Sequence, residues 1–263
     1  MKRSTLLLFL ISVSNAVISQ QKIITQGYLM YNVKYITENT LDLPPPPPPP
    51  PSGIVIPQQE STLVSFEDEG IDLNISFNPS YLKIVEVIRG RTTFLINRQN
   101  SSVTRLNEGF GFKNGTIATK EDAAAVEKYL DSLYGKKKEP VITPKIEYSD
   151  EQQIINGFNC KKILLITEFL NAKADTVTVW YFPDYKLADS FIYCANEMKY
   201  KEKLSLLNSI NGLPVKVDMF VTKKMKLVLE LKKIDIAKNV SEKEFLVPKG
   251  FELKSIKDHY GIK

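Results

Sequence analysis

The chain has 263 residues, of which 43% are hydrophobic and 25% are charged. These fractions lie near those of globular domains and exclude a largely disordered chain. The formal net charge is only +5, and the basic residues form no stripe with interleaved aromatic side chains, so we expect no nucleic-acid partner.

The first 20 residues have the features of a cleavable signal peptide. Lys2 and Arg3 supply positive charge, an uncharged apolar stretch runs from Leu6 to Val13, and small residues around Ala16 offer a cleavage site. The apolar stretch is less than half of the about 20 residues that a spanning helix needs. We therefore predict export to the periplasm, with the cell surface or the exterior as the alternative, and no transmembrane segment after cleavage. Loss of the two basic residues lowers the net charge from +5 to +3.

The first predicted strand covers residues 27–35, where apolar and polar side chains alternate with a period of two. Eight prolines then occupy positions 44–51. Proline has no N–H group to donate, so this run forms an extended polyproline II rod outside any sheet. It is either a docking site for an aromatic groove or a stiff spacer. We expect residues 21–263 to form a single β-rich domain with this polyproline insertion.

Four short β-like segments follow, at residues 73–77, 81–88, 92–97 and 101–106. Turn residues separate them, so the segments should pair as antiparallel neighbours in a meander. The next tripeptide, Gly109-Phe110-Gly111, is not followed by the Lys-Ser/Thr of a nucleotide-binding loop. We interpret it as a flexible loop.

The hydrophobic period then becomes helical. Thr119 and Asp122 resemble a capping box, and Gly135 is typical of a helix end. Between them, an apolar stripe at helical spacing consists of Val126, Tyr129, Leu130 and Leu133. We predict a helix whose stripe packs against the sheet.

The second half returns to strands. Residues 160–168 and 176–182 form a predicted hairpin, and residues 195–207 a short helix. Two runs with strong alternation follow, at residues 215–221 and 225–232, which is typical of a sheet with one covered and one solvated face. The predicted fold class is α+β, with a single curved antiparallel sheet covered by a helix.

Several short motifs in this half occur in a fixed order. They are Gly157 within residues 155–162, Trp180 within 179–181, the tripeptide Gly212-Leu213-Pro214, and Pro248 and Gly250 within 245–251. In this order they resemble the landmarks of the GLPGLI family of exported Gram-negative bacterial proteins, over roughly residues 153–253. The resemblance implies a LolA-like fold, in which the curved sheet forms an incomplete barrel wrapped around one or two helices and its concave face can hold acyl chains. It implies no catalytic residue.

The motif residues also have structural interpretations. Gly157 suits a tight hairpin, Gly212 and Pro214 suit a turn that enters a strand, and Trp180 suits a core or rim position. Val215 stands where the family motif has its second glycine.

Catalytic and metal-binding chemistry has little support. The sole histidine, His259, is the fifth residue from the end of the sequence, which argues against a Ser/His/Asp or Cys/His arrangement. Cys160 and Cys194 are either a disulfide, which export permits, or two buried free thiols. Two cysteines and one histidine form no recognisable metal site, and we expect no cofactor.

Three functions remain open. The first is a non-enzymatic binding module for a hydrophobic ligand or a lipidated partner, with Trp180, Val217 and Met219 as candidate lining residues. The second is a structural or interaction protein of the cell envelope, with the polyproline rod as its docking element. The third is a hydrolase that uses a pair of carboxylates.

Overall fold

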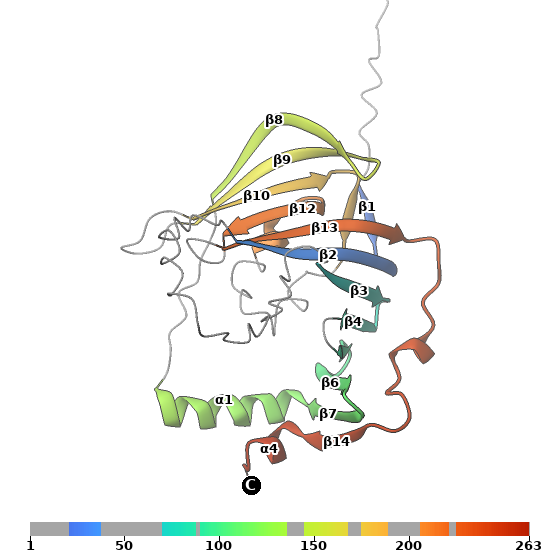
Figure 1. Cartoon of the computed structure of the whole chain (residues 1–263), viewed down its shortest axis with the longest axis vertical. Coiled ribbons are helices and arrows are strands. Elements are labelled where there is room, and N and C mark those ends of the chain that lie inside the picture. Colours follow the sequence, from blue (N-terminus) through green and yellow to red (C-terminus); the bar gives the residue numbers. More distant parts are fainter. Residues whose placement is uncertain are drawn as a thin grey trace, which may run out of the picture.

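The computed structural model describes residues 21–37, 70–87, 90–135, 145–167, 175–188, 206–220 and 225–262. Within these ranges it contains strands, two α-helices and two short 3-10 helices (Figure 1). The strands are β1 (Lys22–Ile24), β2 (Gly27–Thr37), β3 (Ile71–Phe77), β4 (Tyr81–Val87), β5 (Arg91–Asn97), β6 (Ser102–Gly109), β7 (Phe112–Ala118), β8 (Lys145–Ile155), β9 (Phe158–Thr167), β10 (Asp175–Phe182), β11 (Tyr185–Leu187), β12 (Leu213–Phe220), β13 (Met225–Asp235) and β14 (Glu252–Ser255). The helices are α1 (Lys120–Tyr134), α4 (Ile256–His259), η1 (Leu206–Ser209) and η2 (Glu242–Phe245).

Twelve of the described strands form one sheet in the order β14-β7-β6-β5-β4-β3-β2-β13-β12-β10-β9-β8. All neighbours in it pair antiparallel except β14, which adds to β7 in parallel. The sheet is strongly curved and does not close (Figure 1). The predicted α+β class with a curved antiparallel sheet is confirmed, and so are the meander and the hairpin of β9 and β10.

The sequence analysis was wrong about the segment around Gly109-Phe110-Gly111. This segment is the tight turn between β6 and β7, with Phe110 at φ 51° and Gly111 at φ 82°. Positive φ at both central residues matches the right-handed twist of a two-residue hairpin, which explains the glycine. Strand β7 was missed because Asn114, Gly115 and Thr116 interrupt any apolar alternation.

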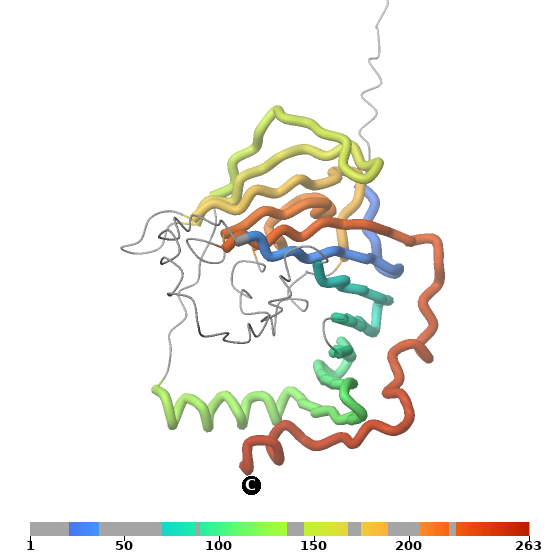
Figure 2. Tube along the Cα trace, viewed as in Figure 1, coloured from blue at the N-terminus to red at the C-terminus, as the bar shows by residue number. Residues whose placement is uncertain are grey.

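The C-terminal strap, residues 236–251, distinguishes the two faces of the sheet. It leaves β13, passes outside the curve of β3 to β6 and reaches β14 (Figure 2). Phe245 of the strap stacks on Tyr81 with ring centroids 5.3 Å apart, Lys83 Nζ donates to the Glu244 carbonyl at 3.1 Å, and the Tyr28 hydroxyl donates to the Glu244 carboxylate. We call the face that carries Tyr28, Tyr81 and Lys83 the outer face, and the opposite face the inner face.

The main core lies on the inner face. Leu29, Ile75, Ile84 and Phe94 are neighbours in register across β2 to β5, and all are buried. The alternating runs of β12 and β13 contribute to the same core, because their alternate residues Val215, Val217, Met219, Leu227, Leu229 and Leu231 are also buried. The predicted alternation of covered and solvated side chains is therefore confirmed for these strands.

The buried face of the sheet changes from the inner face to the outer face between β4 and β7. Strand β5 is buried on both faces, through Phe94 and Ile96 on the inner face and Thr93 and Leu95 on the outer face. In β6 the buried side chains are Thr104 and Leu106, which share the outer face with Thr93 and Leu95. A Cβ added to Gly115 of β7 would lie 2.9 Å from Leu106 and 2.8 Å from Leu253 of β14, so the outer side is tightly packed here. Towards the β6–β7 turn, the inner face of these strands carries the polar side chains Asn107 and Asn114 and the exposed Phe112.

Helix α1 has the predicted bounds and N-terminal cap, since the Thr119 hydroxyl accepts from the Asp122 amide at 3.1 Å. Its packing differs from the prediction. Val126 is buried, but Leu133 is 55% exposed and Tyr129 is 39% exposed. The helix contacts α4 and the end of β7, so the described sheet leaves most of the stripe uncovered.

Several predictions concern residues outside the described ranges. These are the signal peptide, the polyproline run 44–51, Val221, Cys194 and all but the last two residues of the helix expected at 195–207. None of the helices in the described ranges has the length and hydrophobicity that crossing a bilayer requires.

Candidate ligand-binding site

The structure does not bring the three expected lining residues together. Val217 and Met219 are fully buried in the inner core, between their neighbours on β10 and β13. Trp180 lies on the opposite face of β10 from Val179, is half-buried, and has the Lys162 ammonium 5.8 Å from its ring centroid. Its position is that of a rim residue, and the three side chains line no common cavity among those found in the described ranges.

Cys160 is buried on β9, and its thiol is unpaired among the residues that the structure describes. Its Sγ lies 3.4 Å from the Phe158 carbonyl oxygen, and burial raises the pKa of the thiol to about 11. A thiol with this pKa stays protonated at neutral pH and is a poor nucleophile. Cys194 is outside the described ranges, and a disulfide between the two stays a prediction.

The family-motif residues occupy turns and tight contacts. Asn156 and Gly157 have φ values of 49° and 84° and form the turn between β8 and β9. At Gly212 an added Cβ would lie 2.1 Å from the Tyr181 ring, so only glycine fits.

The remaining motif residues lie at the start of β12 and in the strap. Leu213 and Pro214 begin β12, and the Pro214 carbonyl accepts a 2.9 Å hydrogen bond from the buried Tyr31 hydroxyl. Pro248 and Gly250 lie in the C-terminal strap, with Gly250 at φ 90°.

A different group of side chains forms a continuous polar surface on the inner face. Strand register places them in one line across β4, β5, β6, β7 and β14. We call this line the polar row; its members are Glu86, Thr92, Asn107, Asn114 and Glu252. The line runs perpendicular to the strands because each member is the direct partner of the next.

Hydrogen bonds connect the centre of the polar row. Asn107 Nδ2 donates to Asn114 Oδ1 at 3.3 Å, and the Thr92 hydroxyl donates to Asn107 Oδ1 at 3.5 Å. Asn114 and Glu252 are exposed, while Glu86, Thr92 and Asn107 are half-buried. These contacts orient the Asn107 amide and leave the exposed atoms of the row accessible to a ligand.

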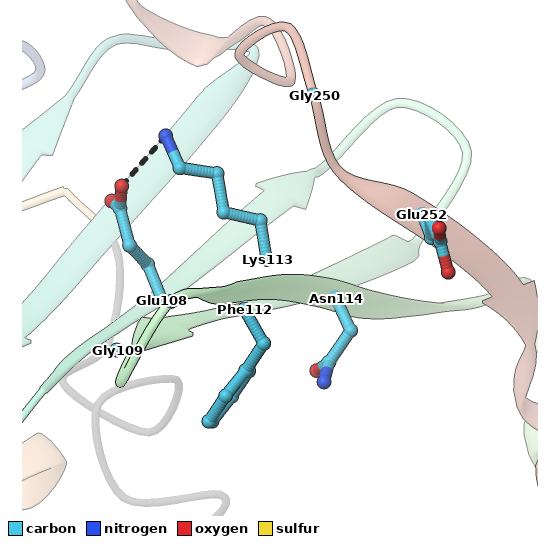
Figure 3. Close-up of a pocket in the computed structure, with 8 residues that line it drawn as sticks. Glu108, Gly109, Phe112, Lys113, Asn114, Gly250 and Glu252 are labelled. Atoms are coloured by element: carbon cyan, nitrogen blue, oxygen red, sulfur yellow. Dashed lines mark ion pairs between the residues drawn. The ribbon is translucent and has the colours of Figure 1, made fainter.

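Two open cavities adjoin the row at the β6–β7 turn. One, of about 480 Å³, is lined by Glu86, Thr92, Asn107, Asn114 and Phe112, among others. The second, of about 630 Å³, shares Phe112 and Asn114 with the first and extends to Glu252 and Gly250. In Figure 3, Phe112 and Asn114 point to the same side of β7, away from Glu108 and Lys113. Both volumes lie in the range of about 300–1,000 Å³ that is usual for ligand pockets.

The charges around these cavities are largely compensated. Lys113 Nζ lies 2.7 Å from the Glu108 carboxylate, and this hydrogen bond lowers the pKa of Glu108. The same ammonium lies 5.7 Å from the centroid of the Phe251 ring. On the inner face, the Arg105 guanidinium lies 5.8 Å from the centroid of the Phe94 ring. The amide groups at the centre of the row offer donors and acceptors without net charge.

The arrangement is suited to binding. The described residues contain no group of three or more His, Cys, Asp or Glu side chains that is arranged to hold a metal ion. His259 lies in the four-residue helix α4 and packs edge-on against Tyr260. Hydrogen-bonding side chains beside exposed aromatic rings are the usual means of fixing an uncharged polar ligand.

The sequence analysis missed the polar row. Its signal was present, because Arg105 and Asn107 alternate with Thr104 and Leu106. Alternation alone does not tell which set of side chains a protein buries, and the segment with Asn114 was not assigned to a strand. The contact between Asn107 and Asn114 could be predicted only if β7 was recognised as the partner of β6.

Comparison with known proteins identifies no family for this chain. No protein-family model matches it, and no curated protein matches it. Among solved structures it is similar to PNGF-II in two crystal forms, C2 and P21, with 13% and 14% sequence identity and TM-scores of 0.38 and 0.36. Each match covers 90% of this chain, which spans about a third of the length of those structures (32% and 33%). Membership in the GLPGLI family stays a prediction.

Proposed function

We propose that this protein is an exported, non-enzymatic binding module that holds its ligand on the inner face of the sheet, at the polar row. The observation that carries the proposal is the change of the buried side from inner to outer between β4 and β6. Without it, the inner positions of β6 and β7 would belong to the core. The change leaves Asn107 and Asn114 in an open cavity beside Phe112.

The side chains considered for a nucleophilic mechanism, Cys160 and His259, do not line this site, so the remaining enzyme alternative is the hydrolase that uses a pair of carboxylates. Cys160 is buried, with a raised thiol pKa. His259 belongs to a short C-terminal helix and contacts the Tyr260 ring. Neither residue lines the two cavities beside the row.

A hydrophobic ligand or a lipidated partner, which the family resemblance implies, is the second candidate. The exposed apolar side chains of α1, Leu133 and Tyr134, favour it. Native mass spectrometry of the full-length protein, purified without detergent from a phospholipid-containing host, tests this candidate. An adduct of lipid mass that is lost in Leu133→Glu supports it, and an unliganded mass contradicts it.

The main proposal is tested with a mixed ligand panel of oligosaccharides, extended peptides and phospholipid vesicles. The wild-type protein is compared with the double variant Asn107→Ala/Asn114→Ala by thermal shift and calorimetry. The control is Asn159→Ala, an exposed asparagine on β9. Binding of any class that the double variant weakens and the control retains supports the proposal. The proposal is contradicted if the double variant binds as tightly as the wild type, or if no ligand class binds.

A further inference from the structure

We infer that the ligand of the polar row is a neutral, linear oligosaccharide that lies across strands β4 to β14. This inference rests on the proposed function and specifies its ligand class. The argument depends on the spacing, the hydrogen-bonding chemistry and the charge of the row.

The spacing of the row suits a chain of repeating units. Neighbouring strands in a sheet lie about 4.8 Å apart, so a row perpendicular to the strands offers one polar side chain at each such step. This step is close to the length of one sugar unit in an extended chain. Glu86, Thr92, Asn107, Asn114 and Glu252 supply one side chain on each of five neighbouring strands.

The side chains match the functional groups of a sugar. A hydroxyl group both donates and accepts a hydrogen bond, and an asparagine amide presents a donor and an acceptor side by side. A sugar ring also has an apolar face of C–H groups, which packs against an aromatic ring. Phe110 is 86% exposed and Phe112 is 48% exposed, and both line the 480 Å³ cavity beside the row.

One exposed phenylalanine is unremarkable on a protein surface. Two of them at the same cavity, on a turn that directs Phe112 to the side of Asn114, form an aromatic platform next to the amides (Figure 3). Phe110 is the first central residue of the β6–β7 turn and has a positive φ.

The charges around the row favour a neutral ligand over an acidic one. Three carboxylates and three basic groups line the two cavities, namely Glu86, Glu108 and Glu252 and Arg91, Arg105 and Lys113. Their charges balance, so a uronate or phosphate chain finds no net attraction there. The nearby ammonium of Lys113 is paired with Glu108 on the other side of β7. The central positions of Thr92, Asn107 and Asn114 carry no charge.

The experiment uses the full-length protein made in bacteria, because Asn114-Gly115-Thr116 is an acceptor sequence for N-glycosylation. The probes are neutral hexasaccharides of glucose, mannose, xylose and N-acetylglucosamine, with oligogalacturonate as the acidic comparison. Calorimetry on the wild type is repeated with Asn107→Ala, Asn114→Ala and Phe112→Ala. Controls are Asn159→Ala and Tyr148→Ala, an exposed aromatic residue on β8.

We expect binding to at least one neutral hexasaccharide and none to oligogalacturonate. Each of the three site variants should weaken binding by about tenfold, the effect of losing about 1.4 kcal/mol of contact, while both controls bind like the wild type. Binding of peptides or vesicles at the row, without any saccharide, overturns the ligand class and leaves the proposed function intact. Equal binding of the acidic saccharide also overturns it. Absence of binding by every class overturns both.

Discussion

Strands β12 and β13 and strands β6 and β7 are two parts of the same sheet, yet they bury opposite faces. In β12 and β13 the inner side chains, such as Val217 and Leu229, form the main core. In β6 and β7 the outer face is packed, at Leu106 and around Gly115, and the inner face carries Arg105, Asn107 and Asn114 beside the exposed Phe112. One curved sheet thus has a scaffold region and a region whose inner face is partly exposed, where we propose that the ligand binds.

The difference follows from what covers the outer face. The C-terminal strap lies against the outer side of β4, where Phe245 stacks on Tyr81. Strand β14 continues the sheet beside β7, with Leu253 close to Gly115 on the outer side. This second packing stabilises the β5–β7 region without using its inner face. A polar surface can then persist on the inner face, because the strands do not depend on it for burial.

The largest expected effect is in the scaffold. Leu231→Ala removes a fully buried side chain opposite Tyr31 and should lower the free energy of unfolding by about 2–5 kcal/mol. Urea denaturation measures it, with the neighbouring exposed Lys232→Ala as the control. The folded fraction should still bind as the wild type does. A loss of affinity in the folded fraction would mean that the two regions are not separate.

A smaller effect is expected at the start of β12. Gly212→Ala places a Cβ against the Tyr181 ring and the Phe182 carbonyl, which forces a backbone shift that costs about 1–3 kcal/mol. The matched control is Gly109→Ala, whose added Cβ would be 3.4 Å from its nearest neighbour. Equal stability of both variants in thermal denaturation would contradict a packing role for the glycine of this motif.

The sequence predicted the scaffold better than the site, for a physical reason. Alternation in β12 and β13 specifies a strand, and the apolar set there is the buried set. In β6 the same rule identifies a strand, but the inside of the sheet carries Arg105 and Asn107. Which side is buried depends on the packing of the outer face, which includes the strap at residues 236–251, far from β6 (Ser102–Gly109) in the sequence.

Helix α1 shows the same limit. Its cap and period fixed its bounds, because these are local properties. Its burial is a tertiary property: in the predicted stripe Val126 is buried, Leu130 is half-buried, and Tyr129 and Leu133 are exposed. Trp180 pairs with Lys216, the neighbour of Val217, so its side chain points to the opposite face of the sheet from Val217.

The attachment of the strap can be tested through pH. Burial, followed by the hydrogen bond to Glu244, raises the pKa of Tyr28 to about 12 from 10.0. Because the folded state holds the phenolic proton more tightly than the unfolded state, this contact contributes its full stabilisation below pH 10. The contribution is lost as the pH rises from 10 towards 12. Tyr28→Phe should therefore cost about 1 kcal/mol at pH 7 and lose less stability than the wild type between pH 10 and 12.

Urea denaturation at a series of pH values measures this difference. Tyr148→Phe is the control, because that ring is 69% exposed. Parallel pH profiles of the wild type and Tyr28→Phe would show that the contact between Tyr28 and the strap does not contribute to stability.

The smallest effect is expected on the exposed side of α1. Leu133→Ala should change the free energy of unfolding by less than about 0.5 kcal/mol, since the side chain is mostly solvated. Val126→Ala, on the buried side of the same helix, should cost more. A large effect of Leu133→Ala in thermal denaturation would show that the stripe is covered after all.

The central claim is that the inner face of β5 to β7 binds the ligand and that the apolar inner face of β12 and β13 does not. NMR of the ¹⁵N-labelled protein during titration with a neutral hexasaccharide tests it most directly. The account predicts shifts of the side-chain amide signals of Asn107 and Asn114 and of the backbone amides around Phe112. Shifts confined to β9–β13 or to α1, with the two side-chain amides unchanged, would contradict it.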